Sequence, residues 1–227
     1  PYFGNKLYRN DTPASSMPQG VHKMSFTDVS AAAGFHGSGL NFGLSASISD
    51  LNFDNWPDIY VTNDYEEQDF CYINNRDGTF KEVSHTLFGH LSKFGMGSDI
   101  ADMNNDGLQD ILVLDMLPED NRRQKLLKGP DEYDRYALAV DSGYHHQYMR
   151  NTLQLNRGFQ ADSLPRFSEI GQLAGISNTD WSWTPFFVDL DNDGYKDIFI
   201  TNGYLRDFTN LDFMKYTSTV YNDAKAA

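Results

Sequence analysis

The chain has 227 residues and a formal net charge of −14, because 32 Asp and Glu residues outnumber 18 Lys and Arg residues. This acidity argues against nucleic-acid binding, which needs clustered Lys and Arg side chains. A hydrophobic content of 40% argues against disorder, and no apolar run approaches the roughly 18 residues of a membrane span. The length suits one large domain or two small ones. The chain begins Pro1-Tyr2-Phe3 without an initiator Met, so we expect a processed or excised piece.

Three units of the chain repeat one order of elements, at residues 5–68, 69–115 and 151–205. Each opens with a short run that is read as a strand (residues 5–10, 69–74 and 151–156) and continues with a second run, a strand, an acidic loop and an apolar β-branched strand that we expect to be buried. The residues 75–78, Asn-Arg-Asp-Gly, predict a hairpin turn between the first two runs. Four strands per repeat are typical of a β-propeller blade.

Residues 116–150 and 206–227 break this pattern. The stretches 119–127 and 131–140 lack strand alternation and predict short helices, which Pro130 separates. We expect the C-terminal segment 206–227 to be partly helical. The lone cysteine, Cys71, lies between Phe70 and Tyr72 and is interpreted as a small buried apolar residue. The chain is therefore predicted to be all-β, part of one propeller domain with a helical insertion at 116–150.

An acidic loop occupies the same place in each unit, with side-chain oxygens at positions 1, 3, 5 and 9. A main-chain carbonyl at position 7 would complete a set of oxygen donors, which suits Ca²⁺ better than Mg²⁺. Position 6 is Gly107, Gly194 or Asn55, residues that tolerate the left-handed backbone of a tight loop. We predict about three calcium ions, whose ligands are Asp50, Asn52, Asp54, Trp56 and Asp58; Asp102, Asn104, Asp106, Leu108 and Asp110; and Asp189, Asp191, Asp193, Tyr195 and Asp197.

Two other interpretations of these loops are weaker. An EF-hand needs a bidentate Glu at position 12, where this chain has Val61, Val113 or Ile200 inside a predicted strand. Ordinary acidic turns would explain one copy, but three copies at equivalent positions favour metal binding. Ten of the 32 acidic residues lie in these loops. Because protein groups complete every ligand set, the predicted role of the metal is structural.

Phe42-Gly43 and Phe94-Gly95, the acidic loops and the apolar strands behind them resemble FG-GAP (VCBS) repeats, the calcium-binding blades of integrin α-chain-like propellers. The upstream runs are similar to the ASPIC/UnbV and cartilage-acidic-protein-like subgroup, and the insertion is similar to large Bacteroidetes surface proteins. The resemblance covers about residues 5–205. Asn55 in place of Gly and Trp181-Ser182 in place of Phe-Gly depart from the family pattern.

The resemblance implies a propeller of about seven blades, of which this chain supplies three to four. The remainder of the parent chain or a neighbouring subunit would then cover the edges of the partial propeller. The resemblance also implies an extracellular or cell-surface location. It is poorly specific for activity, because one fold hosts many functions.

The function expected from these features is a non-catalytic, calcium-stabilised module that binds or adheres to a glycan or a protein. The alternative is a glycan-active enzyme of the polysaccharide-lyase kind, or an accessory subunit of a surface glycan-uptake system. Candidate ligand-binding residues lie on the insertion, where loops commonly carry function: Tyr144, His145, His146 and Tyr148. The favoured alternative for these aromatic residues is that they pack the insertion against a blade.

Overall fold

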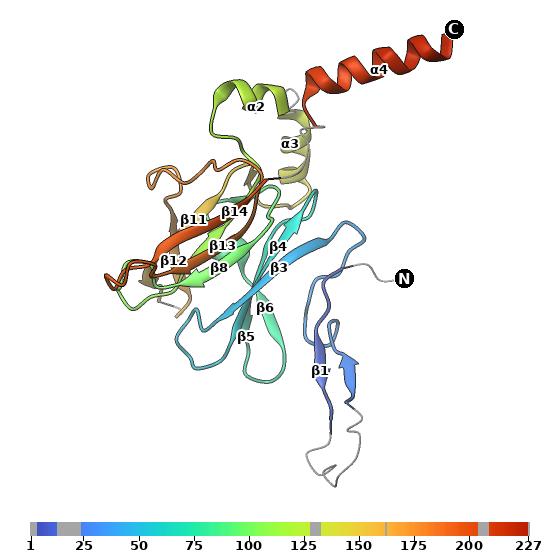
Figure 1. Ribbon diagram of the computed structural model, residues 1–227. Coiled ribbons are helices and arrows are strands. Elements are labelled where there is room, and N and C mark those ends of the chain that lie inside the picture. Colours follow the sequence, from blue (N-terminus) through green and yellow to red (C-terminus); the bar gives the residue numbers. More distant parts are fainter. Residues whose placement is uncertain (1–3, 13–23, 128–132, 162, 204–208, 227) are drawn as a thin grey trace, which may run out of the picture.

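The computed structural model describes residues 4–12, 24–127, 133–161, 163–203 and 209–226. In these ranges most of the regular structure is β, which confirms the predicted all-β fold (Figure 1). The strands are β1 Tyr8–Asn10, β2 Phe26–Asp28, β3 Phe42–Ser49, β4 Asp58–Asp64, β5 Phe70–Asn74, β6 Phe80–Glu82, β7 Leu91–Ser92, β8 Ser98–Ala101, β9 Asp110–Val113, β10 Gln147–Tyr148, β11 Thr152–Phe159, β12 Pro165–Glu169, β13 Ser182–Val188 and β14 Asp197–Asn202. The helices are α1 Ser84–Leu87, α2 Asn121–Leu127, α3 Tyr133–Asp141 and α4 Leu211–Ala226.

Two antiparallel four-stranded sheets form the body of the molecule. The first sheet has the order β3-β4-β5-β6, and the second has the order β8-β9-β11-β12. Their second strands, β4 and β9, are rich in apolar and β-branched residues and are mostly or entirely buried. Such runs suit strands that are covered on both faces. Tyr60 of β4 pairs with Cys71 of β5, and Ile111 of β9 pairs with Gln154 of β11.

Two further hairpins correspond to halves of such a sheet. The N-terminal hairpin, β1 and β2, carries Asn10 at the place of Asn74 in β5 and Asn156 in β11, so it matches the third and fourth strands. The C-terminal hairpin, β13 and β14, flanks an acidic loop and therefore matches the first and second strands. Each hairpin is a separate two-stranded sheet.

The first strands of successive sheets lie side by side, with β8 between β3 and β13 (Figure 1). Ser47 of β3 donates a hydrogen bond to the carbonyl of Ser98 at 2.9 Å. Asp99 of β8 accepts one from the amide of Phe187 in β13 at 2.8 Å. This arrangement of sheets around their first strands is the one expected of propeller blades.

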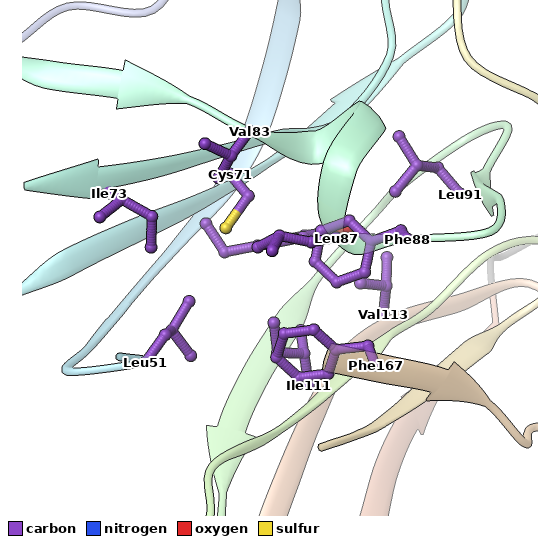
Figure 2. Close-up of a cluster of buried hydrophobic side chains, with 11 residues drawn as sticks. Leu51, Cys71, Ile73, Val83, Leu87, Phe88, Leu91, Ile111, Val113 and Phe167 are labelled. Atoms are coloured by element: carbon purple, nitrogen blue, oxygen red, sulfur yellow. The ribbon is translucent and has the colours of Figure 1, made fainter. Parts of the chain in front are cut away.

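A shared apolar cluster holds the first and second sheets together (Figure 2). It buries side chains from both sheets and from α1, which follows β6 directly. Cys71 lies in this cluster with no exposed surface, as expected of a small apolar residue. The members of the cluster are Leu51, Tyr60, Cys71, Ile73, Val83, Leu87, Phe88, Leu91, Ile111, Val113 and Phe167.

The helices α2 and α3 lie between β9 and β11 in the chain and project from one end of the sheets (Figure 1). An ion pair between Arg135 of α3 and Glu66 fixes this segment to the first sheet, and β10 pairs in parallel with β7. Pro130 lies outside the described residues. Within the described ranges, no helix has the length and apolar character needed to cross a membrane.

The sequence predicts a buried strand after every acidic loop, but β14, which follows the third loop, is largely exposed. Phe199 is 53% exposed, and no residue of β14 is fully buried. The reason is that β14 pairs with β13 alone in the described part of the chain, whereas β4 and β9 are each flanked by strands on both sides.

Candidate metal centre

Each acidic loop connects the first and second strands of its sheet. The first loop (residues 50–58) precedes β4, the second loop (residues 102–110) precedes β9, and the third loop (residues 189–197) precedes β14. All three have a left-handed backbone at positions 4 and 6, with φ of 57° and 67° at Phe53 and Asn55, 59° and 86° at Asn105 and Gly107, and 60° and 91° at Asn192 and Gly194. The three loops therefore turn in the same way, although Asn55 replaces glycine in the first.

The carboxylate at position 1 organises the turn. In the first loop, Asp50 accepts hydrogen bonds from the amides of Asp54 at 3.0 Å and Asn55 at 2.8 Å. Asp54 accepts one from the amide of Trp56 at 2.8 Å, which orients the peptide at position 7. The same bonds recur from Asp106 (3.1 Å) and Gly107 (2.8 Å) to Asp102, from Leu108 to Asp106 (2.8 Å), from Asp193 (3.2 Å) and Gly194 (3.0 Å) to Asp189, and from Tyr195 to Asp193 (2.8 Å).

The carboxylate at position 9 anchors the end of each loop. Asp58 and Asp110 are fully buried, and they accept hydrogen bonds from the amides of Leu51 at 2.9 Å and Met103 at 3.2 Å, respectively. The exposed Asp197 accepts the equivalent bond from Leu190 at 3.0 Å. All three carboxylates are therefore held at the base of their loops.

The third loop brings three carboxylates closest together. Oxygens of Asp189, Asp191 and Asp197 all lie within 4.8 Å of one another. Within the described ranges this is the one group of three or more Asp, Glu, His or Cys side chains that converges so tightly. The first and second loops have Asn52 and Asn104 at the place of Asp191, so each presents one charge fewer.

The electrostatics of the loops fit a hard divalent cation. The pKa of Asp58 is raised to about 6, chiefly by burial and to a smaller extent by the charges of Asp54 and Asp50, against two amide hydrogen bonds that lower it. Burial also raises the pKa of Asp110, with smaller contributions from Asp106 and Asp102. A bound Ca²⁺ would relieve this repulsion, and the donors are the carboxylate, amide and carbonyl oxygens that Ca²⁺ accepts.

The second and third loops touch each other. Asn105 donates a hydrogen bond to the carbonyl of Gly194 at 2.8 Å, although the two residues lie 89 positions apart. In the first loop, Phe53 occupies the position of Asn105 and packs edge-on against Phe159 of β11, with 5.7 Å between ring centroids. Position 4 thus faces the neighbouring sheet in both cases.

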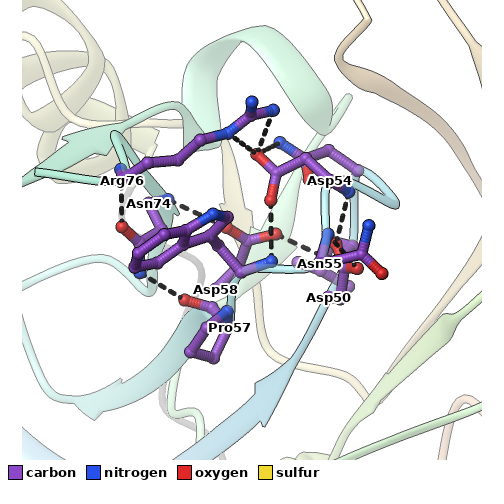
Figure 3. Close-up of polar contacts among 10 residues, drawn as sticks. Asp50, Asp54, Asn55, Pro57, Asp58, Asn74 and Arg76 are labelled. Carbon is purple, nitrogen blue, oxygen red and sulfur yellow. Dashed lines mark hydrogen bonds and ion pairs between the residues drawn. The ribbon is translucent and has the colours of Figure 1, made fainter.

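The first loop differs from the other two by an ion pair. Arg76, in the β5–β6 turn, places Nε and Nη2 each 3.0 Å from Oδ2 of Asp54 (Figure 3). Burial tends to raise the pKa of Asp54, but hydrogen bonds from Asn52 and Arg76 outweigh it and leave the pKa below its usual value. The role of Arg76 is not visible in the sequence, because the Asn-Arg-Asp-Gly pattern at residues 75–78 indicates a turn and does not reveal which loop lies beside it.

The four candidate residues on the insertion fall into two groups. Tyr144 lines a cavity of about 350 Å³ between the insertion and the first sheet, together with Glu67, Glu82 and His36. Burial and the charge of Glu67 raise the pKa of Tyr144. Glu67 is 9% exposed and accepts a hydrogen bond from Ser38 at 2.6 Å.

The other three candidates lie elsewhere. His145 is buried, and its Nε2 lies 3.1 Å from the carbonyl oxygen of Phe88. Burial and the adjacent His85, whose ring stacks on it at 4.6 Å, lower the pKa of His145. His146 and Tyr148 both contact the hydroxyl of Tyr136, at 2.7 and 3.2 Å. The histidine pair therefore contacts the segment that follows the first sheet on one side and α3 of the insertion on the other.

Comparison with protein-family sequence models finds one described as an FG-GAP-like repeat, which matches residues 50–113. This segment begins with the first loop and ends with β9, so it contains two of the three acidic loops. Residues 50–113 are thus an FG-GAP-like repeat segment, in agreement with the pattern read from the sequence. A search of curated proteins finds no match.

Proposed function

We propose that this chain is a calcium-stabilised module of β-propeller blades that binds a glycan or a protein at the surface of a cell or in a secreted protein, without catalysis. The observation that carries this proposal is the common geometry of the three acidic loops. They share the same two left-handed positions and the same carboxylate-to-amide bonds. Ordinary turns need no such repetition, whereas three equivalent metal sites do.

Calcium would be held by the carboxylates at positions 1, 5 and 9, by the side-chain oxygen at position 3 and by the carbonyl at position 7. Its contribution would be electrostatic, since it neutralises carboxylates that the fold holds close together. The residues of the chain position these oxygens before the ion arrives, because amide hydrogen bonds already orient the side chains at positions 1, 5 and 9.

Calorimetric titration of the chelator-treated chain with Ca²⁺ tests this part of the proposal. We expect calcium uptake and a higher melting temperature with calcium than in chelator, since the ion binds the folded state. Asp106→Ala and Asp193→Ala should each delete one site. Asp134→Ala, on the exposed face of α3, is the matched control and should keep all sites. No uptake, together with an unchanged melting temperature, would exclude the proposed calcium role.

The ligand site that we propose is the cavity beside Tyr144. It combines an aromatic side chain from the insertion with the carboxylates Glu67 and Glu82 of the first sheet. A concave site with an aromatic face and a few fixed polar groups is suited to small or extended ligands. The insertion contributes one wall, in keeping with the expectation that it carries the binding function.

A glycan array followed by product analysis tests the binding function. Tyr144→Ala should weaken retention of any glycan bound, while Tyr133→Ala, a 74% exposed tyrosine outside the cavity, should not. Retained binding in the Tyr144 variant would place the ligand elsewhere. Depolymerisation of a bound glycan would favour the alternative, a glycan-active enzyme.

We also propose that further chain, from the same protein or from a neighbouring subunit, pairs with the C-terminal hairpin. Asp58 and Asp110 each bridge to an amide of the third strand of their sheet, at 2.8 Å. Within the described residues, Asp197 accepts the hydrogen bond from the amide of Leu190 in its own loop, but none from a third strand. An additional strand beside β14 would supply the missing amide and cover an exposed edge. FG-GAP repeats are typical of extracellular proteins, which supports the proposed location.

A further inference from the structure

The three acidic loops differ in the groups that contact one carboxylate oxygen, Oδ2 of the residue at position 5. Oδ1 of the position 5 carboxylate accepts the amide at position 7 in all three loops, which leaves Oδ2 for a cation. In the second loop, Oδ2 of Asp106 accepts a hydrogen bond from Asn104 at 3.0 Å. In the first loop, Oδ2 of Asp54 accepts the equivalent bond from Asn52 and also contacts the guanidinium of Arg76. The first loop thus already holds a positive charge.

The position of Arg76 is fixed by its turn. The side chain of Asn74 accepts a hydrogen bond from the amide of Arg76 at 2.8 Å, and Arg76 has φ 66°. In the second sheet, Asn156 accepts the same bond from Gly158 at 3.0 Å, with φ 91°. The two turns are therefore equivalent, and glycine stands where the first sheet has arginine. The neighbouring Arg157 is exposed.

The guanidinium and a calcium ion compete for the same oxygen. The guanidinium is also a like charge for an incoming cation. The Arg76 side chain is 56% exposed while Asp54 is 10% exposed, so Arg76 can move into solvent when the ion binds. It therefore weakens the site without closing it.

The number of carboxylates in each loop also indicates that the first loop binds calcium least tightly. The third loop has four carboxylates, the second has three, and the first has three with Arg76 against one of them. Calcium affinity rises with the number of charged ligands. We propose that Arg76 acts as a built-in cation of the first loop, so that the chain has two strong calcium sites, in the second and third loops, and one weak site. This inference rests on the proposed calcium binding.

Terbium and calcium titrations of the chelated chain test the inference. Trp56 lies at position 7 of the first loop, so terbium emission excited through tryptophan reports on this loop, while calorimetry with Ca²⁺ counts all sites. We expect two strong sites and one weaker site in the parent chain. Arg76→Ala should strengthen the weak site by up to about fivefold, the size of a surface ion pair. Arg157→Ala, at the equivalent turn of the second sheet, should change no site.

The outcomes separate this inference from the proposed function. Three equal sites in the parent chain, or an Arg76 variant whose weak site is unchanged, would overturn the role of Arg76 and leave calcium binding intact. No calcium binding by the second and third loops would overturn both. An Asp54→Ala variant should lose the weak site and the tryptophan-excited terbium signal, and persistence of that signal would also contradict the inference.

Discussion

The carboxylate of Asp58 reaches from the end of the first loop to the third strand of its sheet, with Oδ1 2.8 Å from the amide nitrogen of Asn74. The other oxygen accepts the amide of Leu51, so one buried side chain joins three segments. Asp110 repeats this bridge to Asn156 in the second sheet at 2.8 Å. The position 9 residue therefore has a structural role even before any ion is bound.

Asp58→Ala should destabilise the chain in the presence of chelator. The substitution leaves two amides without their acceptor inside the protein, which costs about 2 kcal/mol in the free energy of unfolding. Asp197→Ala is the matched control, because the equivalent carboxylate is exposed and makes one of the two bonds. Urea unfolding followed by circular dichroism measures the difference. Equal losses in the two variants would contradict the bridging role.

Stability in chelator should fall as the pH rises from about 4 to about 7. Burial raises the pKa of Asp69 to about 7, against hydrogen bonds from the amide of Asn63 and the hydroxyl of Tyr60. An unfolded Asp has a pKa of about 3.9. The folded state thus holds a proton that the unfolded state has lost, and this contribution is complete below the unfolded pKa and disappears as the pH passes the folded one.

Asp69→Asn should flatten this pH dependence, because an amide does not titrate. Urea unfolding at a series of pH values compares the parent chain with the variant. Asp58 and Asp115, whose pKa values are both raised to about 6, chiefly by burial, leave a smaller slope of the same sign. Asp134→Asn, on the surface of α3, should reproduce the parent curve. A variant at Asp69 with the full parental slope would disprove the assignment.

Ile111→Ala should destabilise the chain by about 2 to 5 kcal/mol, the usual effect of emptying a buried aliphatic site. Ile111 has no exposed surface and belongs to the cluster that both four-stranded sheets share. Leu138→Ala, at a 66% exposed position of α3, should change the free energy of unfolding by about 0.5 kcal/mol or less. Thermal unfolding of both variants provides the measurement, and similar melting temperatures would contradict a shared core.

Gly97→Ala should disturb the contact between the second sheet and the C-terminal hairpin. A Cβ atom at this position would lie 2.2 Å from the carbonyl oxygen of Trp183, closer than real contacts allow. We expect a loss of about 1 to 3 kcal/mol and a changed tryptophan emission spectrum. Gly89→Ala is the control, because an added Cβ there has no neighbour within 4 Å. An unchanged spectrum for Gly97→Ala would place the hairpin differently.

The repeated features of the structure could be predicted from the sequence, whereas the ion pair of Arg76 with the first loop could not. The strand order and the acidic loops recur three times, so each copy supported the others, and Asn55 was recognised as a substitute for glycine. Arg76 occurs once, and its effect depends on the third strand lying beside the second, which spacing along the chain does not reveal.

The burial of individual side chains could also be predicted only in part from the sequence. Ile198 to Ile200 has the composition of a buried strand, but the exposure of β14 depends on the number of its neighbours. His145 and His146 are adjacent in sequence and face opposite environments, one against Phe88 and the other against Tyr136. The composition of a segment indicates its preferred secondary structure, whereas contacts between distant segments determine how far each side chain is buried.

The single thiol of Cys71 can report how often the surrounding apolar cluster opens. It has no exposed surface, and burial raises its pKa well above the usual value. A thiol-reactive reagent can therefore modify it when the cluster between the two four-stranded sheets opens, and at no other site, since the chain has one cysteine. The labelling rate, followed by mass spectrometry, would measure how fast the two four-stranded sheets separate, without any engineered probe.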